Sequence, residues 1–250
     1  MGMRIAIVLT GLLAMAVTGV SAQDHAGAKP IRAAVVTGGH DFDAKVFPGL
    51  FAGQADIEAT IVPQKDDSEI FENIEDWPYD VIVLYNMTQK ITEQRQANFV
   101  ALLRRGVGLV ALHHAVAAYN KWPEYQKIIG ASYFLEETVI DGQTFPRGTY
   151  KHDVSIQVDI ADPAHPITKG VQPFTLVDET YSTYTFDPAA KVLLSTTNPE
   201  SAPTLCHVKT YDKAKVCYLQ LGHGPQAFSD PNYQRLVAQA IRWTAGRLDE

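Results

Sequence analysis

The first half of the chain alternates short apolar runs with segments of helical periodicity. Four runs are predicted strands: residues 31–36, 57–62, 80–85 and 107–112. The run at residues 80–85 shows almost no alternation of apolar and polar positions, as expected of a strand that is covered on both faces. Residues 92–105 carry apolar side chains at helical spacing, residues 44–51 are expected to be helical at least in part, and residues 68–77 are expected to form a helix capped by Ser68. This alternation predicts a parallel, doubly wound sheet, for which the flavodoxin-like strand order is the simplest arrangement.

The second half of the chain has a different pattern, with short strands joined by short turns. The predicted strands are residues 155–160, 191–195, 204–210 and 215–221, and the last two form a hairpin. Residues 231–245 close the chain as a helix, with Asp230 as its cap and Pro231 in its first turn. We therefore predict an α/β, flavodoxin-like three-layer fold with a mostly parallel central sheet, a C-terminal β-hairpin and a closing helix. Residues 121–150 are irregular and suit an insertion that covers a site.

The N-terminal residues are typical of a secretory signal. Arg4 precedes an apolar run over residues 5–17, and small residues at 20–22 supply a cleavage site after Ala22. A membrane anchor is the alternative, but the run is shorter than the roughly 20 residues that span a bilayer. We expect a signal peptide over residues 1–22, a leader over 23–30 and one domain over 31–246. The mature protein would then be periplasmic or secreted, without a membrane association.

Composition and motifs exclude several classes of partner. The formal net charge is −7 and no run of Lys or Arg stands out, so we expect no nucleic-acid partner. The chain has no GxGxxG motif or P-loop, so we expect no nucleotide cofactor. Cys206 and Cys217 flank a probable turn, and they either pair across the hairpin or stay as two buried thiols, depending on its register. The sequence says nothing about the oligomeric state.

Histidines gather where the predicted strands end. His40 follows the first strand, His113 and His114 follow the fourth, and His223 follows the last. Because ligands of open α/β sheets bind beyond the carboxyl ends of the strands, this convergence indicates a functional cluster more than four separate structural histidines. His113 and His114 would point to opposite faces if the strand continued through both, and would diverge less at a turn.

A carboxylate is needed for chemistry at this cluster, and residues 178–181 (DETY) offer one. The residues leave two chemistries open. Neutral histidines together with one carboxylate of this segment suit a divalent metal such as Zn, Mn or Fe. The same set without a metal could carry out general acid/base chemistry, because histidine titrates near neutral pH. In the structural alternative, Asp178 and Glu179 only cap a turn.

The residues after the fourth predicted strand also argue against catalysis by a Ser or Cys nucleophile. An α/β hydrolase or an amidotransferase carries its Ser or Cys nucleophile there, but this chain has His113 and His114, and it has no GxSxG motif. Neither cysteine lies near this position in the sequence. We therefore expect no covalent thiol catalysis of that kind.

Several segments recur in this order in one family. They are TGGH at 37–40, VALHHA at 110–115, Trp122, DPAHPITKG at 162–170, DETY at 178–181, LGH at 221–223 and a terminal helix containing Trp243. Over residues 31–246 the chain resembles the ThuA-like family, named for trehalose utilisation, whose fold is similar to that of class I glutamine amidotransferases without the catalytic cysteine. The resemblance implies that His40, His113, His114, Glu179 and His223 line the site, with Tyr181 nearby. On this basis the expected metal ligands are His40, His113, His223 and Glu179, and the expected residues of acid/base catalysis are His113, His114, Glu179 and Tyr181. Many relatives carry another His or a Pro after His40, where this chain has Asp41 and Phe42.

The resemblance also implies a role in sugar catabolism. We expect an enzyme that acts on 3-keto-glycosides or related sugars by acid/base elimination, hydrolysis or isomerisation, with or without a metal, and that is not a glutamine amidotransferase. Two other hypotheses stay open at this point. One is a non-catalytic carbohydrate-binding module that stacks sugars on aromatic residues, namely Tyr119, Trp122, Tyr125 and Tyr133. The other is a metal-dependent hydrolase of an unrelated substrate. His165 is expected only to shape a turn.

Overall fold

The computed structural model describes residues 29–65, 67–140 and 142–248. The predicted signal peptide over residues 1–22 and the leader as far as residue 28 lie outside the described residues. Within the described ranges, no helix is long and apolar enough to cross a membrane.

The centre of the molecule is a mixed sheet of nine strands in the described part of the chain. In order across the sheet, these are β2 (Ile57–Pro63), β1 (Ile31–Gly38), β3 (Val81–Asn86), β4 (Gly108–Leu112), β13 (Ala214–Leu219), β12 (Thr204–Tyr211), β11 (Lys191–Ser195), β8 (Tyr150–Ile160) and β9 (Phe174–Tyr181). The first five strands are parallel to one another, and the other four pair antiparallel. The order β2-β1-β3-β4-β13 is the flavodoxin-like arrangement, which confirms the predicted sheet.

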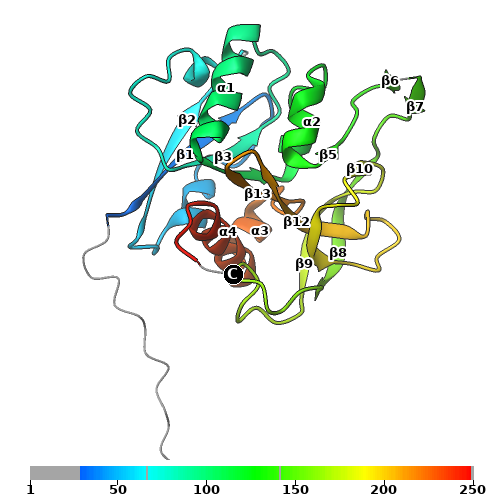
Figure 1. Cartoon of the computed structure of the whole chain (residues 1–250). Helices are drawn as coiled ribbons and strands as arrows, with labels where there is room; N and C mark the ends of the chain where they lie inside the picture. The colour runs from blue at the N-terminus through cyan, green and yellow to red at the C-terminus, as the bar shows by residue number, and fades with distance from the viewer. Residues whose placement is uncertain (1–28, 66, 141, 249–250) are drawn as a thin grey trace, which may run out of the picture.

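Helices cover both faces of this sheet (Figure 1). The α-helices are α1 (Glu93–Arg105), α2 (Pro123–Ile129), α3 (Pro225–Ser229) and α4 (Pro231–Thr244). Buried side chains of α1 and α2 belong to one core cluster, and those of α3 and α4 to a second cluster on the opposite face. The predicted caps are present, since Thr92 accepts the Arg95 amide and Asp230 accepts the amides of Asn232 and Tyr233.

Short elements complete the fold. They are the 3-10 helices η1 (Phe47–Phe51), η2 (Glu69–Phe71) and η3 (His113–Ala117), and the small strands β5 (Ala131–Ser132), β6 (Thr138–Ile140), β7 (Gln143–Phe145) and β10 (Thr185–Phe186). β6 and β7 form a hairpin that stands away from the body of the molecule (Figure 1).

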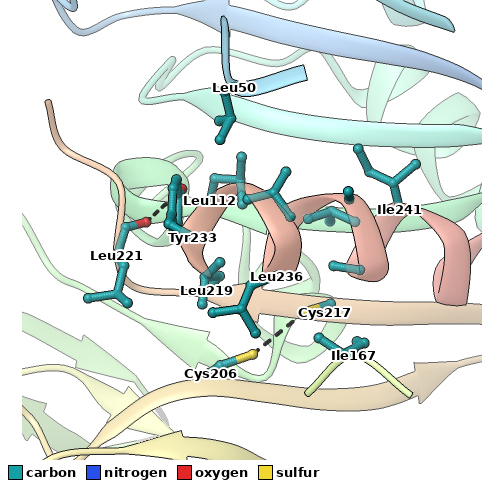
Figure 2. Close-up of a cluster of buried hydrophobic side chains, with 14 of the residues drawn as sticks. Leu50, Leu112, Ile167, Cys206, Cys217, Leu219, Leu221, Tyr233, Leu236 and Ile241 are labelled. Atoms are coloured by element: carbon teal, nitrogen blue, oxygen red, sulfur yellow. Dashed lines mark hydrogen bonds between the residues drawn. The ribbon is translucent and has the colours of Figure 1, made fainter. Parts of the chain in front are cut away.

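Helix α4 supplies much of the core on its side of the sheet. Figure 2 shows its Tyr233, Leu236 and Ile241 beside Leu112 of β4 and Leu219 of β13. These five side chains are at most 1% exposed. Complete burial of one such aliphatic side chain is worth about 1.5–3 kcal/mol, so this packing holds the ends of β4 and β13 firmly in place.

Two sequence predictions about helices were wrong in extent. Residues 68–77 contain only the short helix η2, and Ser68 makes no cap bond, because its hydroxyl lies 2.7 Å from the Tyr119 hydroxyl in the core. The carbonyls of Phe71 and Ile74, which helix amides would need, accept hydrogen bonds from Asn98 and Arg105 of α1 instead. Residues 44–51 are helical only in η1.

The segment over residues 121–150 is more regular than the sequence predicts. It contains α2, which buries Tyr125, Ile128 and Ile129 against the sheet. Its proline at the first helical position and Gly130 at its end are ordinary helix boundaries that the irregular composition obscured. Tyr133, within the same segment, packs against Tyr181 with ring centroids 4.8 Å apart.

Strands β8 and β9 form a two-stranded ribbon at one edge of the sheet, and the ribbon extends to the end of β4 near the centre of the sheet. β8 pairs with β11 only at Asp159 and Ile160, so most of the ribbon is free of the main sheet (Figure 1). The Tyr181 end of β9 thereby reaches the carboxyl end of β4, where its hydroxyl lies 3.0 Å from the His113 ring. The ribbon therefore places Asp178 and Glu179 of β9 next to the histidines.

The register of the β12–β13 hairpin decides whether Cys206 and Cys217 lie on the same face of the sheet. Cys206 pairs with Leu219, and Cys217 pairs with Val208, so the two thiols are diagonal neighbours on one face. Their sulfurs are 3.8 Å apart, and both thiols are free and buried (Figure 2). Burial raises the pKa of the Cys206 thiol well above its usual range, which keeps it protonated and unreactive.

Candidate active site

His113 occupies a strained turn at the end of β4. Its φ angle is +48°, in the left-handed region that residues with a Cβ rarely adopt, and η3 begins at the same residue. A sharp strand-to-helix turn of this kind is where related α/β folds present a nucleophile above the sheet. In this chain the strained position presents an imidazole, and strain of this kind is concentrated at functional sites.

The ring of His113 has a defined tautomer. Its Nδ1 lies 2.6 Å from the backbone carbonyl oxygen of Gln220, an acceptor only, so Nδ1 carries a proton and donates it. In the neutral ring, Nε2 therefore holds the lone pair. This atom lies 3.0 Å from the Tyr181 hydroxyl and 3.4 Å from Oε1 of Glu179. The site thus contains a completely buried imidazole with its basic nitrogen directed at a carboxylate and a phenol.

Glu179 lies among three imidazoles. Besides His113, its Oε2 is 2.8 Å from Nδ1 of His152 and 3.6 Å from Nε2 of His223. Burial raises the pKa of Glu179, but the hydrogen bond and charge of His113, the charge of His223 and the Tyr181 hydroxyl outweigh it. The net pKa lies below its usual value, so Glu179 is a carboxylate at neutral pH.

His152 is the residue of this site that the sequence analysis missed. It precedes the predicted strand, and it reaches Glu179 because β8 contains a bulge. Lys151 pairs with Thr180 and Val154 with Asp178, so two residues of β8 face the single residue Glu179. Bulges of this kind re-aim side chains at active sites. The only signal in the sequence was a histidine in a strand that pairs with the acidic segment, which requires knowledge of the register.

Hydrogen bonds with Asp178 and Tyr85 fix the backbone of the loop that carries His223. Both carboxylate oxygens of Asp178 accept backbone amides, from Gly222 at 2.6 Å and from His223 at 2.9 Å. The Tyr85 hydroxyl donates to the carbonyl of Gly222 and lies 3.2 Å from that of His223. Gly222 has a φ of +116°, and a Cβ there would meet the Tyr233 hydroxyl at 2.0 Å, so only glycine fits. Asp178 therefore fixes the backbone of the loop that carries His223.

His40 and His114 form a second pair beside the first group. Their rings stack with centroids 4.5 Å apart, and His40 is also 5.8 Å from His223. Burial lowers the pKa of His114 well below its usual value, the charges of His113 and His40 lower it further, and the backbone of Tyr85 opposes this. His114 is therefore neutral.

The tyrosine hydroxyl at the site stays protonated. Burial, followed by the charge of Glu179, raises the pKa of Tyr181 well above its usual value. Burial also lowers the pKa of His223, with the charge of His113 acting in the same direction. At neutral pH the site thus combines the Glu179 carboxylate, the imidazoles of His114 and His223 with lowered pKa values, and the Tyr181 hydroxyl as a donor.

One group within the described residues has ligand atoms that converge as at a metal site. It comprises His113, Glu179 and His223, whose ligand atoms all lie within 4.8 Å of one another. His40, which the sequence analysis included in a metal set, is not part of this group and stacks on His114 instead. His113, Glu179 and Tyr181 of the predicted acid/base set are in mutual contact.

Other residues named from the sequence lie elsewhere. The aromatic residues proposed for sugar stacking are at most 8% exposed, so they pack the core and offer no platform: Tyr119, Trp122, Tyr125 and Tyr133. His165 accepts the Ile167 amide on its Nδ1 and forms a turn, as expected.

Comparison with known families agrees with this geometry. The family model for ThuA, described as trehalose utilisation, matches residues 32–244. The chain belongs to the ThuA family. The predicted resemblance is therefore confirmed, and the strained turn of this ThuA protein is occupied by His113.

Solved structures of ThuA-like proteins share the fold. A ThuA-like protein from Parabacteroides merdae is similar with a TM-score of 0.73 at 19% identity, over 89% of this chain and 92% of the other. One from Bacteroides uniformis has a TM-score of 0.64 at 22% identity, over 90% and 95%. A cytoplasmic protein from Salmonella typhimurium has a TM-score of 0.57 at 14% identity, over 84% and 98%. No functionally curated protein matches the chain.

Proposed function

We propose that this ThuA protein is a carbohydrate-processing enzyme that acts on 3-keto-glycosides or related keto-sugars by acid/base elimination, hydrolysis or isomerisation. The observation that carries the proposal is the contact of a buried carboxylate with both an imidazole and a phenol, in Glu179, His113 and Tyr181. The family's description as trehalose utilisation supports a sugar as the substrate.

The proposed chemistry starts at the carbon next to the ketone. The ketone acidifies the hydrogen on that carbon, and Glu179 accepts this proton, since its lowered pKa keeps it ionised. The electron pair moves into the carbonyl group and forms an enolate. Collapse of the enolate either expels the glycosidic oxygen from the adjacent carbon or takes up a proton at a new position, which isomerises the sugar.

A hydroxyl donor next to the base suits this chemistry. Tyr181 has a raised pKa, so it can donate a hydrogen bond to the enolate oxygen without losing its own proton in the resting site. The departing glycosidic oxygen needs a proton, and our candidate donor is His152, because its Nδ1 lies 2.8 Å from Oε2 of Glu179 and its side chain is 52% exposed. A general acid, a general base and an oxyanion donor are thus within one cluster.

A catalytic role explains the burial of these groups better than simple sugar binding does. A module that only binds sugars needs exposed aromatic faces and exposed hydrogen-bonding groups, whereas Glu179 is 5% exposed and His113 is completely buried. Burial of ionisable groups is costly unless it tunes their chemistry.

The direct test is an assay of purified protein with 3-keto-trehalose and a 3-keto-glucoside. We expect turnover by the wild type and a loss of about 10²–10⁴-fold in Glu179→Gln, as for removal of a general base. The matched control is Glu200→Gln, because Glu200 is an exposed carboxylate that pairs with Lys151. Its activity should stay within about twofold of the wild type.

Two results would contradict the proposal. The first is a wild type that turns over neither keto-sugar. The second is tight binding of unoxidised trehalose in calorimetry without turnover of its 3-keto form, which would favour a binding module.

Export of the protein stays a prediction from residues 1–22, outside the described residues.

A further inference from the structure

Three segments that are far apart in the sequence direct ligand atoms at one point. His113 comes from the end of β4, Glu179 from β9 and His223 from the loop after β13. Nε2 of His113 lies 3.4 Å from one oxygen of Glu179, and Nε2 of His223 lies 3.6 Å from the other. Ligand atoms bound to one ion at about 2.0–2.2 Å lie roughly 3.0–3.5 Å from each other. With one atom taken from each residue, the ligand atoms of this group all lie within 4.8 Å of one another, so small side-chain movements would bring them around one ion.

The first histidine is oriented as a metal ligand would be. Metal-binding histidines generally donate their second ring N–H to a carboxylate or a backbone carbonyl, which fixes the tautomer and the ring plane. His113 does this through Nδ1 and the Gln220 carbonyl at 2.6 Å. Its Nε2 lone pair therefore points into the site before any ion arrives.

The other two ligands are also held in place by their surroundings. The backbone of His223 is fixed by Asp178, which accepts its amide at 2.9 Å. The carboxylate of Glu179 is oriented by His152, whose Nδ1 lies 2.8 Å from Oε2. An ion would therefore meet two ligand side chains that are already oriented and a third residue whose backbone is fixed, which favours tight binding.

We propose that His113, Glu179 and His223 bind one divalent transition-metal ion of the Zn, Mn or Fe class. Two imidazoles and one carboxylate suit these ions, whereas Mg²⁺ and Ca²⁺ require mainly oxygen ligands. His152 orients the carboxylate and is not one of the three ligands. Each residue offers one ligand atom, so Glu179 would bind the ion through one oxygen and keep the other as the proton acceptor of the proposed enzyme. This chemical role rests on the proposed function, but the existence of the metal site can be tested without a substrate.

The Tyr181 hydroxyl is hydrogen-bonded to the ring nitrogen of His113 that would bind the ion. It occupies the Nε2 lone pair of His113 at 3.0 Å, so an ion must displace this hydrogen bond. Removal of this hydroxyl should therefore make the ion bind more tightly, not less.

The experiment is a calorimetric titration of chelator-treated, full-length protein with Zn²⁺ and with Co²⁺, whose visible absorption reports its ligands. We expect one ion per chain, and an affinity that falls by about 100-fold or more in Glu179→Gln and in His223→Gln. His40→Gln is the matched control, because His40 is in the cluster but outside the converging group. Its affinity should change by less than about threefold, and that of Tyr181→Phe should rise, by up to about tenfold.

The midpoint of thermal unfolding, measured at increasing Zn²⁺ concentrations, provides a second readout of binding for a variant that folds poorly. The wild-type midpoint should rise with the ion concentration, whereas the midpoints of the two ligand variants should not. Absence of wild-type binding below about 100 μM would overturn the metal site, as would an equal loss of affinity in His40→Gln and His223→Gln, or a loss in Tyr181→Phe.

The outcomes also separate this inference from the proposed function. A protein that binds one ion through these residues but turns over no keto-sugar would keep the metal site and contradict the proposed activity. A protein that turns over keto-sugars with or without chelator, and binds no ion, would overturn the metal site alone.

Discussion

The buried carboxylate of Asp178 accepts the backbone amide of His223 at 2.9 Å, so an acidic side chain on β9 holds the loop that follows β13. Its second oxygen accepts the Gly222 amide. Replacing this carboxylate by an amide in Asp178→Asn puts an NH₂ group opposite a backbone donor. We expect a loss of about 1–3 kcal/mol in the free energy of unfolding, measured by urea denaturation.

The control for this variant is Asp153→Asn. Asp153 is exposed and has a φ of +56°, which asparagine also adopts readily, so its stability should change by less than about 0.5 kcal/mol. Equal stability of Asp178→Asn and the wild type would show that the carboxylate does not clamp the loop.

The strained turn at His113 predicts an unusual order of stability. His113→Ala and His113→Gly both remove the imidazole, but only glycine adopts the +48° φ angle without steric cost. We expect His113→Gly to be more stable than His113→Ala by about 1 kcal/mol. In an ordinary helix or strand the order would be reversed, so an alanine variant that is the more stable of the two in urea denaturation would contradict the strained turn.

Gly222 and Tyr233 should be energetically coupled. A Cβ on residue 222 would lie 2.0 Å from the Tyr233 hydroxyl, and the φ of +116° adds strain, so Gly222→Ala should destabilise the fold by more than about 2 kcal/mol. Tyr233→Phe removes the hydroxyl and its hydrogen bond to the Leu221 carbonyl. The double variant should lose less stability than the sum of the two single losses, by about 0.5 kcal/mol or more. Strict additivity in the denaturation curves would contradict this contact.

The sequence predicts the core of the fold because the parallel strands are buried on both faces. Runs such as residues 31–36 and 107–112 correspond to β1 and β4, and the caps Thr92 and Asp230 correspond to real helix starts. The helix expected over residues 68–77 is the counterexample, because its Ser68 hydroxyl and its carbonyls bind distant partners, and local propensity cannot show such partners.

The candidate site could be predicted only in part, for a related reason. The rule that parallel strands end at one edge places His40, His113, His114 and His223 together without any coordinates. His152 needs the bulge opposite Glu179, and this depends on the register of an antiparallel ribbon. The separation of His40 from the converging group depends on ring orientations, which spacing along the chain does not encode.

Acid should destabilise the fold through His207, a buried residue of β12. Burial lowers the pKa of His207 to about 4 from an ordinary 6.5, although its hydrogen bond to the Ile129 carbonyl opposes the shift. Between these two pH values the unfolded chain binds a proton that the folded protein does not. The free energy of unfolding therefore decreases as the pH falls from 6.5 to 4, by about 3 kcal/mol from this residue, and it is unaffected above 6.5.

The matched variant is His207→Gln, whose side-chain amide can still donate to the Ile129 carbonyl but does not titrate in this range. The variant loses ring packing against Phe186 and Tyr218, which lowers its stability by a similar amount at every pH. The difference in stability between wild type and variant, from urea denaturation at pH 7, 5.5 and 4, should therefore shrink or reverse as the pH falls. Other buried histidines such as His114 are present in both proteins and cancel in this difference. A difference that is the same at all three pH values would mean that His207 titrates normally in the folded protein.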